Sequence, residues 1–469
     1  MEQLSLASLG VVGEWIWGDD AETTVFAQAF GINRTIIFRF IADKSHPDSL
    51  PSRIVNCFHD RNISQPQETF PGRVAMRATL WSAVAAIWLD CARLDATSQP
   101  DTIINVTEDG SWEVVTDYLF ADYLSLLPEP SDFEAQGLTK TVAFQNLTRL
   151  QQLGGRGCTT LVHDSSTPEA KMVFKGVDFR TFLFTYESGL VKEEITSFKR
   201  SIELLCHMPP HPYILPAPQI LVTMTDRERK CEYVCGCLYP FYTNGNLADK
   251  IEESNGTGVR IPLPLKAKWC YQMTAAIAHT HYEAKTFHMD IKPGNFILDD
   301  NSNVVLVDWE QNDAPVTTAA PEMDGTWDAQ EMSERLPDGS TTTRVLYSKY
   351  QGPPRRNMPE ETPGSNGWNV WNSLLHWQKT CPKAAELAEV FSLGRTMWML
   401  LSQYRSEDLD DVESTEDVVE DWSGSDTIPA SYKTLVGSCL ERDPTKRPAL
   451  EQVERFWATA LQDLEKQSR

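Results

Sequence analysis

Residues 288–300 read "HMDIKPGNFILDD", and this stretch decides how the rest of the chain is interpreted. It places a carboxylate at Asp290, an amine two residues on at Lys292 and an amide five residues on at Asn295. A predicted hairpin follows, and its second strand, "VVLVDWE", brings a second carboxylate at Asp308. An ordinary polar loop needs none of these groups at these intervals, so the pattern indicates a chemical site.

These four side chains match the requirements of phosphoryl transfer, which needs a base for a hydroxyl, a cation beside phosphate and oxygen ligands for Mg²⁺. Asp290 is placed to accept the hydroxyl proton, and Lys292 is placed to steady the transferred phosphate. Asn295 and Asp308 are the candidate metal ligands. We therefore expect a catalytic loop followed by a metal-binding strand end.

Two stretches nearer the N-terminus supply candidates for holding nucleotide phosphates. In "LGGRGCTTLV" (153–162), Gly155 and Gly157 would let backbone N–H groups approach phosphate oxygens, and Val162 follows them. "MVFKG" then puts Lys175 on a predicted strand, at a spacing that suits a lysine reaching the α- and β-phosphates.

With these motifs in place, residues from about 139 to 460 resemble the eukaryotic protein kinase superfamily, of the Ser/Thr type. The resemblance rests further on "HPYIL" (211–215), "APE" (320–322), "EVFSLGRTMWMLL" (389–401) and "CLERDPTKRP" (439–448). The stretch "AEVFSLGRTMWMLL" (388–401), together with "DWEQ" (308–311) and "PPHP" (209–212), looks like filamentous-fungal kinase-like proteins.

The resemblance implies an α+β, bilobal fold that uses ATP and Mg²⁺ as cofactors. A β-rich small lobe is expected over about 139–239 and a helical large lobe over about 243–460. Residues 1–135 lie outside the resemblance and form an additional N-terminal α/β region of unassigned function.

The resemblance also assigns roles that the residues alone do not. "LYPFYTNGNL" (238–247) resembles the kinase hinge, with Tyr239 as the gatekeeper. The C=O of Pro240 and the N–H of Tyr242 would then meet the adenine edge. Arg447 would pair with Glu322 in the large lobe.

Four positions depart from the family pattern. Met289 replaces the arginine that pairs with a phosphorylated activation segment, which argues against that mode of activation but not against catalysis. Trp309 and Glu310 replace the Phe and Gly after the metal-binding Asp, and Glu389 replaces a shorter Asp that supports the catalytic loop.

The carboxylate expected to orient Lys175 is harder to place. Aligning "SIELLCHMPPHPYI" (201–214) on the family pattern puts Ser201 where that Glu should stand. Glu194 lies two turns earlier on the same helix face, and Glu203 lies on another face. Whether either of them partners Lys175 remains open.

Three functions fit the motifs. The first is a Ser/Thr protein kinase, favoured by Lys292 and by the expected Arg447–Glu322 pair. The second is a small-molecule kinase of the choline or aminoglycoside type, whose Asp-x-Glu resembles "DWE" (308–310). The third is a pseudokinase scaffold that binds nucleotide without turnover.

Net charge and cysteine spacing limit the classes of partner and metal that the chain is expected to bind. The net charge of −24 argues against a nucleic-acid partner. The acidic tract Glu407–Asp421 is expected to be a mobile surface segment that favours a basic protein substrate. "CEYVCGC" (231–237) lacks companion ligands and favours a buried strand over a zinc site.

The amino terminus lacks the basic and apolar regions of a signal peptide, and no uncharged apolar run approaches the roughly 20 residues that span a bilayer. A cytoplasmic or nuclear, non-secreted protein is expected, with no membrane partner and no prediction of oligomeric state.

Patterns outside the kinase motifs predict the remaining elements. Strands are expected at 23–30 and 34–42, and a helix over 71–96 with an apolar stripe that includes Ala78 and Trp81. The tract from Met323 to Pro382, rich in Gly, Pro, Asn and Trp, is expected to be a loop.

Overall fold

The computed structural model describes residues 9–18, 22–29, 34–58, 70–91, 101–107, 111–115, 119–154, 159–179, 181–182, 191–226, 229–311, 314–335, 341–352, 373–405, 409, 412 and 414–467. The chain forms two compact units. The first unit comprises Met1–Ile195 and Pro218–Phe241, and the second comprises Thr196–Ala217 and Tyr242–Arg469. The first is β-rich and the second largely helical, which is the predicted α+β class and is consistent with a bilobal kinase-like fold.

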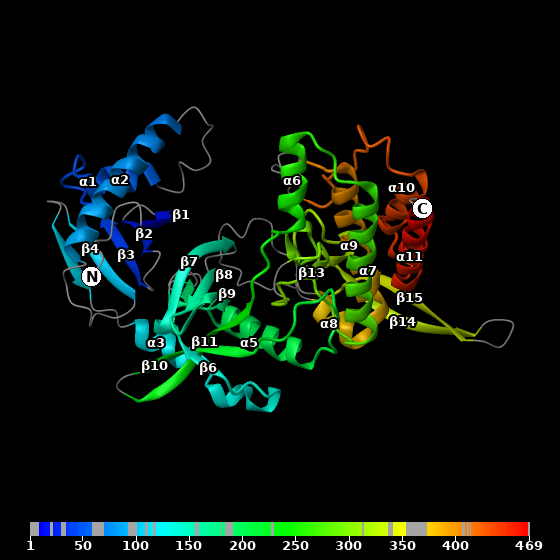
Figure 1. The fold of residues 1–469 in the computed structure, drawn as a ribbon, viewed down its shortest axis with the longest axis horizontal. Helices are drawn as coiled ribbons and strands as arrows, with labels where there is room; N and C mark the ends of the chain where they lie inside the picture. The colour runs from blue at the N-terminus through cyan, green and yellow to red at the C-terminus, as the bar shows by residue number, and fades with distance from the viewer. Residues whose placement is uncertain are drawn as a thin grey trace. The chain divides into compact units, whose positions relative to one another are not determined.

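The N-terminal region contains a five-stranded sheet of order β1-β2-β3-β4-β5, with two helices packed against it (Figure 1). Only β3 and β4 are parallel, since the chain passes through both helices between them. The elements are β1 (Leu9–Gly18), β2 (Glu22–Ala29), β3 (Arg34–Ile41), α1 (Leu50–Phe58), α2 (Phe70–Cys91), β4 (Asp101–Val106) and β5 (Trp112–Val115). Their shared core includes Val25, Phe38, Phe40, Ile54, Leu80 and Ile104.

Helix α2 confirms the helix predicted over 71–96, but a different face of it is buried. Leu80, Val84 and Ile87 pack into the core, whereas Ala78 is exposed and Trp81 only half-buried. The segment is apolar on several faces, so periodicity alone could not identify the one that meets the sheet.

The first unit also contains a six-stranded sheet, in the order β6-β10-β11-β9-β8-β7. Its strands are β6 (Thr141–Ala143), β7 (Leu147–Gly154), β8 (Thr159–Asp164), β9 (Thr167–Gly176), β10 (Ile220–Asp226) and β11 (Cys231–Pro240). Helix α3 (Leu119–Leu126) and the 3₁₀ helix η4 (Pro130–Gln136) precede it, and the 3₁₀ helix η5 (Phe144–Asn146) lies between β6 and β7. Cys235 and Cys237 are fully buried on β11, which confirms a strand with buried thiols.

Two glycines allow β9 and β11 to lie close together. Gly176 and Gly236 pair across these strands. A Cβ atom on Gly236 would lie 2.2 Å from the ring of Phe174, and one on Gly176 would lie 2.1 Å from the carbonyl oxygen of Cys235. Only glycine fits at either position.

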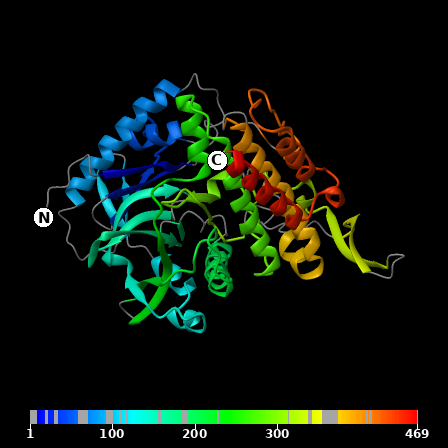
Figure 2. The same ribbon diagram turned by 45° about the vertical axis from the view of Figure 1, so that its right-hand side comes forward.

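The second unit is built around the long helix α9 (Pro382–Ser402), which is buried along almost its whole length. Its apolar side chains surround the axis, as expected of a central helix. Helix α7 (Leu263–Tyr282) packs against both α9 and α11 (Leu450–Gln467) (Figures 1 and 2). The other elements are α6 (Leu247–Thr257), β12 (Phe296–Leu298), β13 (Val304–Leu306), α10 (Ala430–Cys439) and the 3₁₀ helices η6 (Pro293–Asn295), η7 (Pro321–Met323) and η9 (Pro444–Lys446). Helix α5 (Val191–His207) crosses from the first unit into the second.

The tract predicted as a loop from Met323 to Pro382 contains regular structure, so that prediction is wrong. Strands β14 (Trp327–Arg335) and β15 (Thr341–Lys349) form a hairpin that projects from the second unit, and α8 (Ser373–Thr380) follows (Figure 1). The scattered Gly, Pro and Asn concealed the strands, because the hairpin buries only part of one face, where Tyr347 meets Trp377.

Within the described ranges, none of the helices has both the length and the apolar side chains that a bilayer crossing requires.

Candidate active site

The loop that follows α7 gathers three of the predicted site residues around one carboxylate. Lys292 Nζ lies 2.7 Å from Asp290 Oδ2, and Asn295 Nδ2 donates to the same oxygen at 2.8 Å. Asn295 Nδ2 also lies 2.8 Å from the backbone carbonyl oxygen of Asp290. The short turn η6, which begins at Pro293, brings the side-chain amide of Asn295 back onto the carboxylate of Asp290. The structure therefore brings together Asp290, Lys292 and Asn295.

The two oxygens of Asp290 differ in their surroundings. Oδ2 accepts both hydrogen bonds, while Oδ1 is buried and has no hydrogen-bond partner among the described residues. Burial raises the pKa of the Asp290 carboxyl; Lys292 opposes this rise and Asp308 adds to it. A carboxylate with one unbonded oxygen and a raised pKa is suited to accept a proton.

The candidate metal ligands Asn295 and Asp308 lie at one end of the β12–β13 hairpin. The N–H of Val307 donates to the carbonyl oxygen of Asn295 at 3.0 Å, which continues the strand pairing up to Asp308. Asp308 has φ of +74°, an uncommon conformation for a non-glycine residue. The hairpin thus brings both predicted ligands to the catalytic loop.

The donor set suits Mg²⁺, which prefers oxygen ligands and retains several waters. With Nδ2 of Asn295 directed to Asp290, the amide oxygen remains as the ligand atom. Within the part of the chain that the structure describes, no three His, Cys, Asp or Glu side chains form a metal site. Phosphate oxygens and water would therefore complete the coordination.

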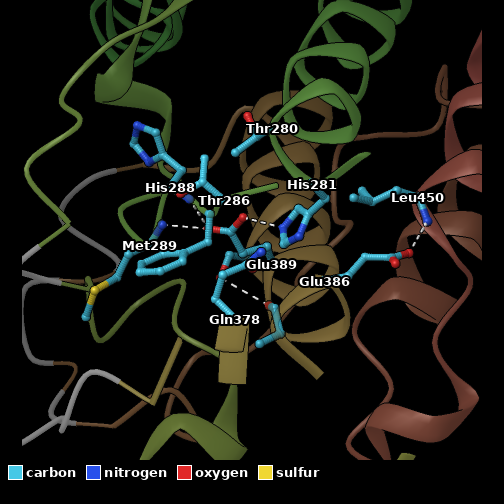
Figure 3. Close-up of polar contacts among 12 residues, drawn as sticks. Thr280, His281, Thr286, His288, Met289, Gln378, Glu386, Glu389 and Leu450 are labelled. Carbon is cyan, nitrogen blue, oxygen red and sulfur yellow. Dashed lines mark hydrogen bonds and ion pairs between the residues drawn. The ribbon is translucent and has the colours of Figure 1, made fainter. Parts of the chain in front are cut away.

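Glu389 on α9 supports the predicted catalytic loop, and Figure 3 shows its side chain between the loop residues His288 and Met289 and the ring of His281. Its Oε1 accepts the backbone N–H groups of His288 at 2.8 Å and Met289 at 2.5 Å. Its Oε2 lies 2.7 Å from His281 Nε2 on α7. The Glu that stands in place of the family's Asp therefore reaches the loop, and its second oxygen is held by a histidine.

The charge of Glu389 is compensated inside the protein. Burial alone would raise the pKa of this carboxyl, but the hydrogen bond and charge of His281 and the N–H of Met289 outweigh it, so the pKa lies below its usual value. A buried carboxylate held in this way fixes the backbone of the loop.

His288 joins the catalytic loop to the strand before Asp308. Its Nε2 lies 2.7 Å from the carbonyl oxygen of Val307, and its ring packs edge-on against Trp309. Burial lowers the pKa of His288, and because the Val307 carbonyl oxygen can only accept, Nε2–H is the donor. Trp309, in place of the family's Phe, is buried in this contact.

Met289 is buried where the family has a cation. It packs in an apolar cluster with Phe287, Ala319, Ala320 and Met323. The cluster extends to the hairpin and α8 through Ala329, Leu374 and Trp377. Met289 also has φ of +79°, a conformation that costs a non-glycine residue roughly 1–2 kcal/mol. Packing and the bond to Glu389 hold it there.

The segment after Asp308 is tied to the same loop. Gln311 Nε2 donates to the carbonyl oxygen of Phe287 at 2.5 Å, and lies 3.2 Å from Thr286 Oγ1. Further on, Arg447 and Glu322 form a buried two-pronged ion pair, with Nη1–Oε1 at 2.5 Å and Nη2–Oε2 at 2.9 Å. The predicted Arg447–Glu322 pair is confirmed.

In the first unit, strand register decides which residues accompany Lys175. Val173 lies two residues before it on β9 and pairs with both Leu161 and Tyr239. Paired residues, and every second residue of a strand, point to the same face of a sheet. Leu161 and Tyr239 therefore share the face of Lys175, as a gatekeeper at Tyr239 requires.

The same register separates Val162 from the face of Lys175. Val162 pairs with Met172 and Arg149, so it points to the opposite face, where the Arg149 guanidinium lies 4.7 Å from the Phe144 ring centroid. Leu161 lies on the face of Lys175 instead, and the nucleotide-binding role of Val162 stays a prediction. Counting from a glycine pattern cannot fix strand register, because a one-residue slip reverses every side chain.

The remaining predicted nucleotide-binding residues are two glycines and two residues of the predicted hinge. Gly155 and Gly157 lie outside the described residues. Pro240 is exposed at the end of β11, and Tyr242 is half-buried. Burial raises the pKa of Tyr242, as do Asp299 and Asp300. The roles of these residues stay predictions.

Helix α5 carries no carboxylate at the aligned position. Ser201 is buried, and its Oγ donates to the carbonyl oxygen of Phe198 within the helix. Glu194 lies in the first turn of α5. Its partnership with Lys175, and that of Glu203, stays a prediction.

The described end of the acidic tract is anchored. Glu420 Oε1 lies 3.0 Å from the buried Arg395 Nη2, and Trp398 Nε1 donates to the carbonyl oxygen of Asp421 at 3.1 Å. This end is therefore not the mobile segment that its composition predicted. Its effect on substrate choice stays a prediction.

Sequence reasoning missed His281 and Gln311. His281 lies 108 positions before Glu389, and nothing local indicates that the two meet. The carboxylate of Glu389 within an apolar helix was the available signal, since a buried charge needs partners. Gln311 follows directly after "DWE" and could have been suspected as a polar residue among buried neighbours.

No protein-family model matches the chain. The chain is 24% identical over 297 residues to the serine/threonine-protein kinase CHK1 of Saccharomyces cerevisiae, a match that covers 63% of this chain and 47% of that protein. The chain thus spans about half the length of this relative. The similarity is distant, and it suggests that the chain belongs to the protein kinase superfamily.

Proposed function

We propose that this protein is an ATP- and Mg²⁺-dependent serine/threonine protein kinase. The observation that carries the proposal is the arrangement at Asp290, where Lys292 and Asn295 hold one carboxylate oxygen and the other is left without a partner among the described residues. This is the arrangement that a hydroxyl-activating base requires.

In the proposed reaction, a substrate hydroxyl donates its proton to Asp290 Oδ1 while its oxygen attacks the γ-phosphorus of ATP. The bond between the γ-phosphorus and the β–γ bridging oxygen breaks, and ADP leaves. Lys292 offsets charge on the transferred phosphate, and Lys175 would hold the α- and β-phosphates.

Asn295 and Asp308 are proposed to bind Mg²⁺, which neutralises charge on the phosphates. Glu389 and His288 are proposed to hold these reacting groups in position relative to one another. Glu389 fixes the backbone of the catalytic loop, and His288 joins that loop to the strand that carries Asp308. Positioning of this kind supplies much of the acceleration in phosphoryl transfer.

A protein substrate is favoured over a small molecule by Lys292 and by the Arg447–Glu322 pair, which the choline and aminoglycoside kinases normally lack. A basic substrate would suit the acidic tract Glu407–Asp421. Both points rest on resemblance and charge.

The test is transfer from labelled ATP with Mg²⁺ to a basic Ser/Thr peptide mixture, with Asp290→Asn alongside. The matched control is Asp300→Asn, an exposed carboxylate ten residues away in the same loop region. We expect transfer that Asp290→Asn abolishes and Asp300→Asn preserves. Nucleotide binding without transfer to any peptide would instead favour a pseudokinase or a small-molecule acceptor.

A further inference from the structure

Helix α3, at the end of the N-terminal region, is attached to the strand that carries Lys175. Tyr123 on α3 is fully buried, and its hydroxyl donates to the carbonyl oxygen of Val177 at 2.7 Å. Val177 follows Lys175 by two residues. This is a direct link from the unassigned region to the candidate nucleotide strand.

Aromatic packing strengthens the link. The ring of Tyr123 lies 5.5 Å from that of Phe179 and 5.3 Å from that of Phe182, and Phe120 meets Phe179 edge-on at 5.1 Å. Phe179 and Phe182 belong to the described residues 177–179 and 181–182, which follow β9. We name these residues the connector.

A second attachment reaches the neighbouring strand. The N–H of Val234 on β11 donates to the carbonyl oxygen of Pro128 at 2.7 Å. Residues 119–137, which we name the strap, thus bind both β9 and β11. Within the strap, η4 is closed by reciprocal bonds between Glu129 and Asp132 and ends at Gly137, so it is an ordered structure.

Hydrogen bonds and close strand packing couple the connector to Lys175, so that a shift of one moves the other. The N–H of Val177 donates to the carbonyl oxygen of Cys235 at 2.8 Å, and Gly176 leaves no space between the strands for adjustment. Asp178 accepts from the buried Arg149 at 3.3 Å and from the N–H of Thr181 at 2.9 Å. A displacement at Val177 is therefore transmitted through two peptide units to Lys175.

We propose that the strap positions Lys175, with Tyr123 as the positioning residue. The N-terminal region then acts on phosphate binding through the connector and without touching nucleotide. This inference rests on the proposed function, in which Lys175 binds the phosphates of ATP.

The test removes one hydroxyl in the full-length chain, by Tyr123→Phe. The control is Tyr282→Phe, which removes a hydroxyl that donates to Glu386 Oε1 at 2.8 Å in the second unit. We expect Tyr123→Phe to raise KM for ATP and the dissociation constant of ADP by roughly three- to tenfold. KM for the peptide should stay unchanged. Amide exchange in residues 177–182 should accelerate, and the control should show none of these changes.

These measurements distinguish a positioning role of the strap from a general loss of folding stability. A variant that only lost folded molecules would lower kcat with KM unchanged, which would overturn the proposal. Faster exchange in the connector with unchanged ADP binding would overturn it too, because the strap would then not reach Lys175. If the native chain binds no nucleotide, the proposed function fails, while exchange in Tyr123→Phe and the milder Phe120→Leu still decides whether the strap orders the connector.

Discussion

At the scale of single residues, Glu389 joins the loop, the central helix and α7 through one carboxylate. Two backbone N–H groups and His281 all depend on its negative charge. A glutamine at this position would keep one acceptor oxygen. Its NH₂ group would then face either the backbone N–H groups or His281, and that contact would weaken or be lost.

We predict that Glu389→Gln lowers the free energy of unfolding by about 2–4 kcal/mol at pH 7. The folded pKa of Glu389 lies below its unfolded value, so its stabilisation is present above about pH 4.5 and is lost as the pH falls through the folded pKa. The difference between native and variant proteins in urea melts should therefore shrink below that pH. A difference that stays constant down to pH 3, or an equal loss in the exposed Glu416→Gln, would contradict the prediction.

Met289 leads to a prediction about regulation. The buried thioether lies among Ala319, Ala320 and Met323, and it carries no charge that could pair with a phosphate. Phosphatase treatment, with removal of phosphate checked by mass spectrometry, should leave the kinase activity unchanged. A loss of activity that autophosphorylation restores would contradict this prediction. It would show that a cation other than one at position 289 binds a phosphorylated residue.

At the scale of elements, the β14–β15 hairpin and α8 support the segment between Asp308 and Glu322. Trp377 on α8 is fully buried and belongs to the same apolar cluster as Met289 and Ala320. Ala329 of β14 and Leu374 and Trp377 of α8, within the tract that the sequence presents as a loop, therefore belong to the core beside the predicted catalytic loop.

We predict that Trp377→Ala lowers the stability of the second unit by about 3–5 kcal/mol, because it empties a large buried volume. Leu375→Ala, two residues earlier on the more exposed side of α8, should cost far less. Thermal melts and protease sensitivity around residues 314–323 provide the measurements. Equal melting temperatures for the two variants would mean that α8 does not support this segment.

The elements also show what the sequence could and could not predict. Strands β2, β3, β9 and β11 and helix α2 could be predicted from the sequence, because each carries apolar residues in the pattern typical of its element. Register could not be predicted: Val162 and Leu161 are neighbours of equal hydrophobicity, and only pairing with β9 distinguishes them. The hairpin was missed because both of its strands are largely exposed.

At the scale of the whole molecule, the proposed nucleotide residues are divided between two compact units. Lys175 belongs to the first and Asp308 to the second. The local motifs around each could be predicted, since they lie within short stretches. The link between the N-terminal region and β9 could not, because Tyr123 meets Val177 across 54 positions.

This division gives a binding prediction. ATP with Mg²⁺ at about 100 times its dissociation constant should stabilise the native chain by about 2.7 kcal/mol. Lys175→Met and Asp308→Asn should each remove most of that gain, since Lys175 is proposed to hold the α- and β-phosphates and Asp308 is proposed to bind Mg²⁺. Thermal shift with titrated ATP measures it. A full shift in either variant would remove that residue from the nucleotide site.

The glycine pair between β9 and β11 has a consequence for how this protein tolerates variation. Gly176 and Gly236 have no side chain to contribute to any reaction, yet every larger residue would collide with Cys235 or Phe174. In a saturation mutagenesis screen scored by activity, both positions should look as intolerant as Asp290. Scoring the same library for abundance would separate them, because variants at Asp290 would accumulate as folded protein and variants at the glycines would not.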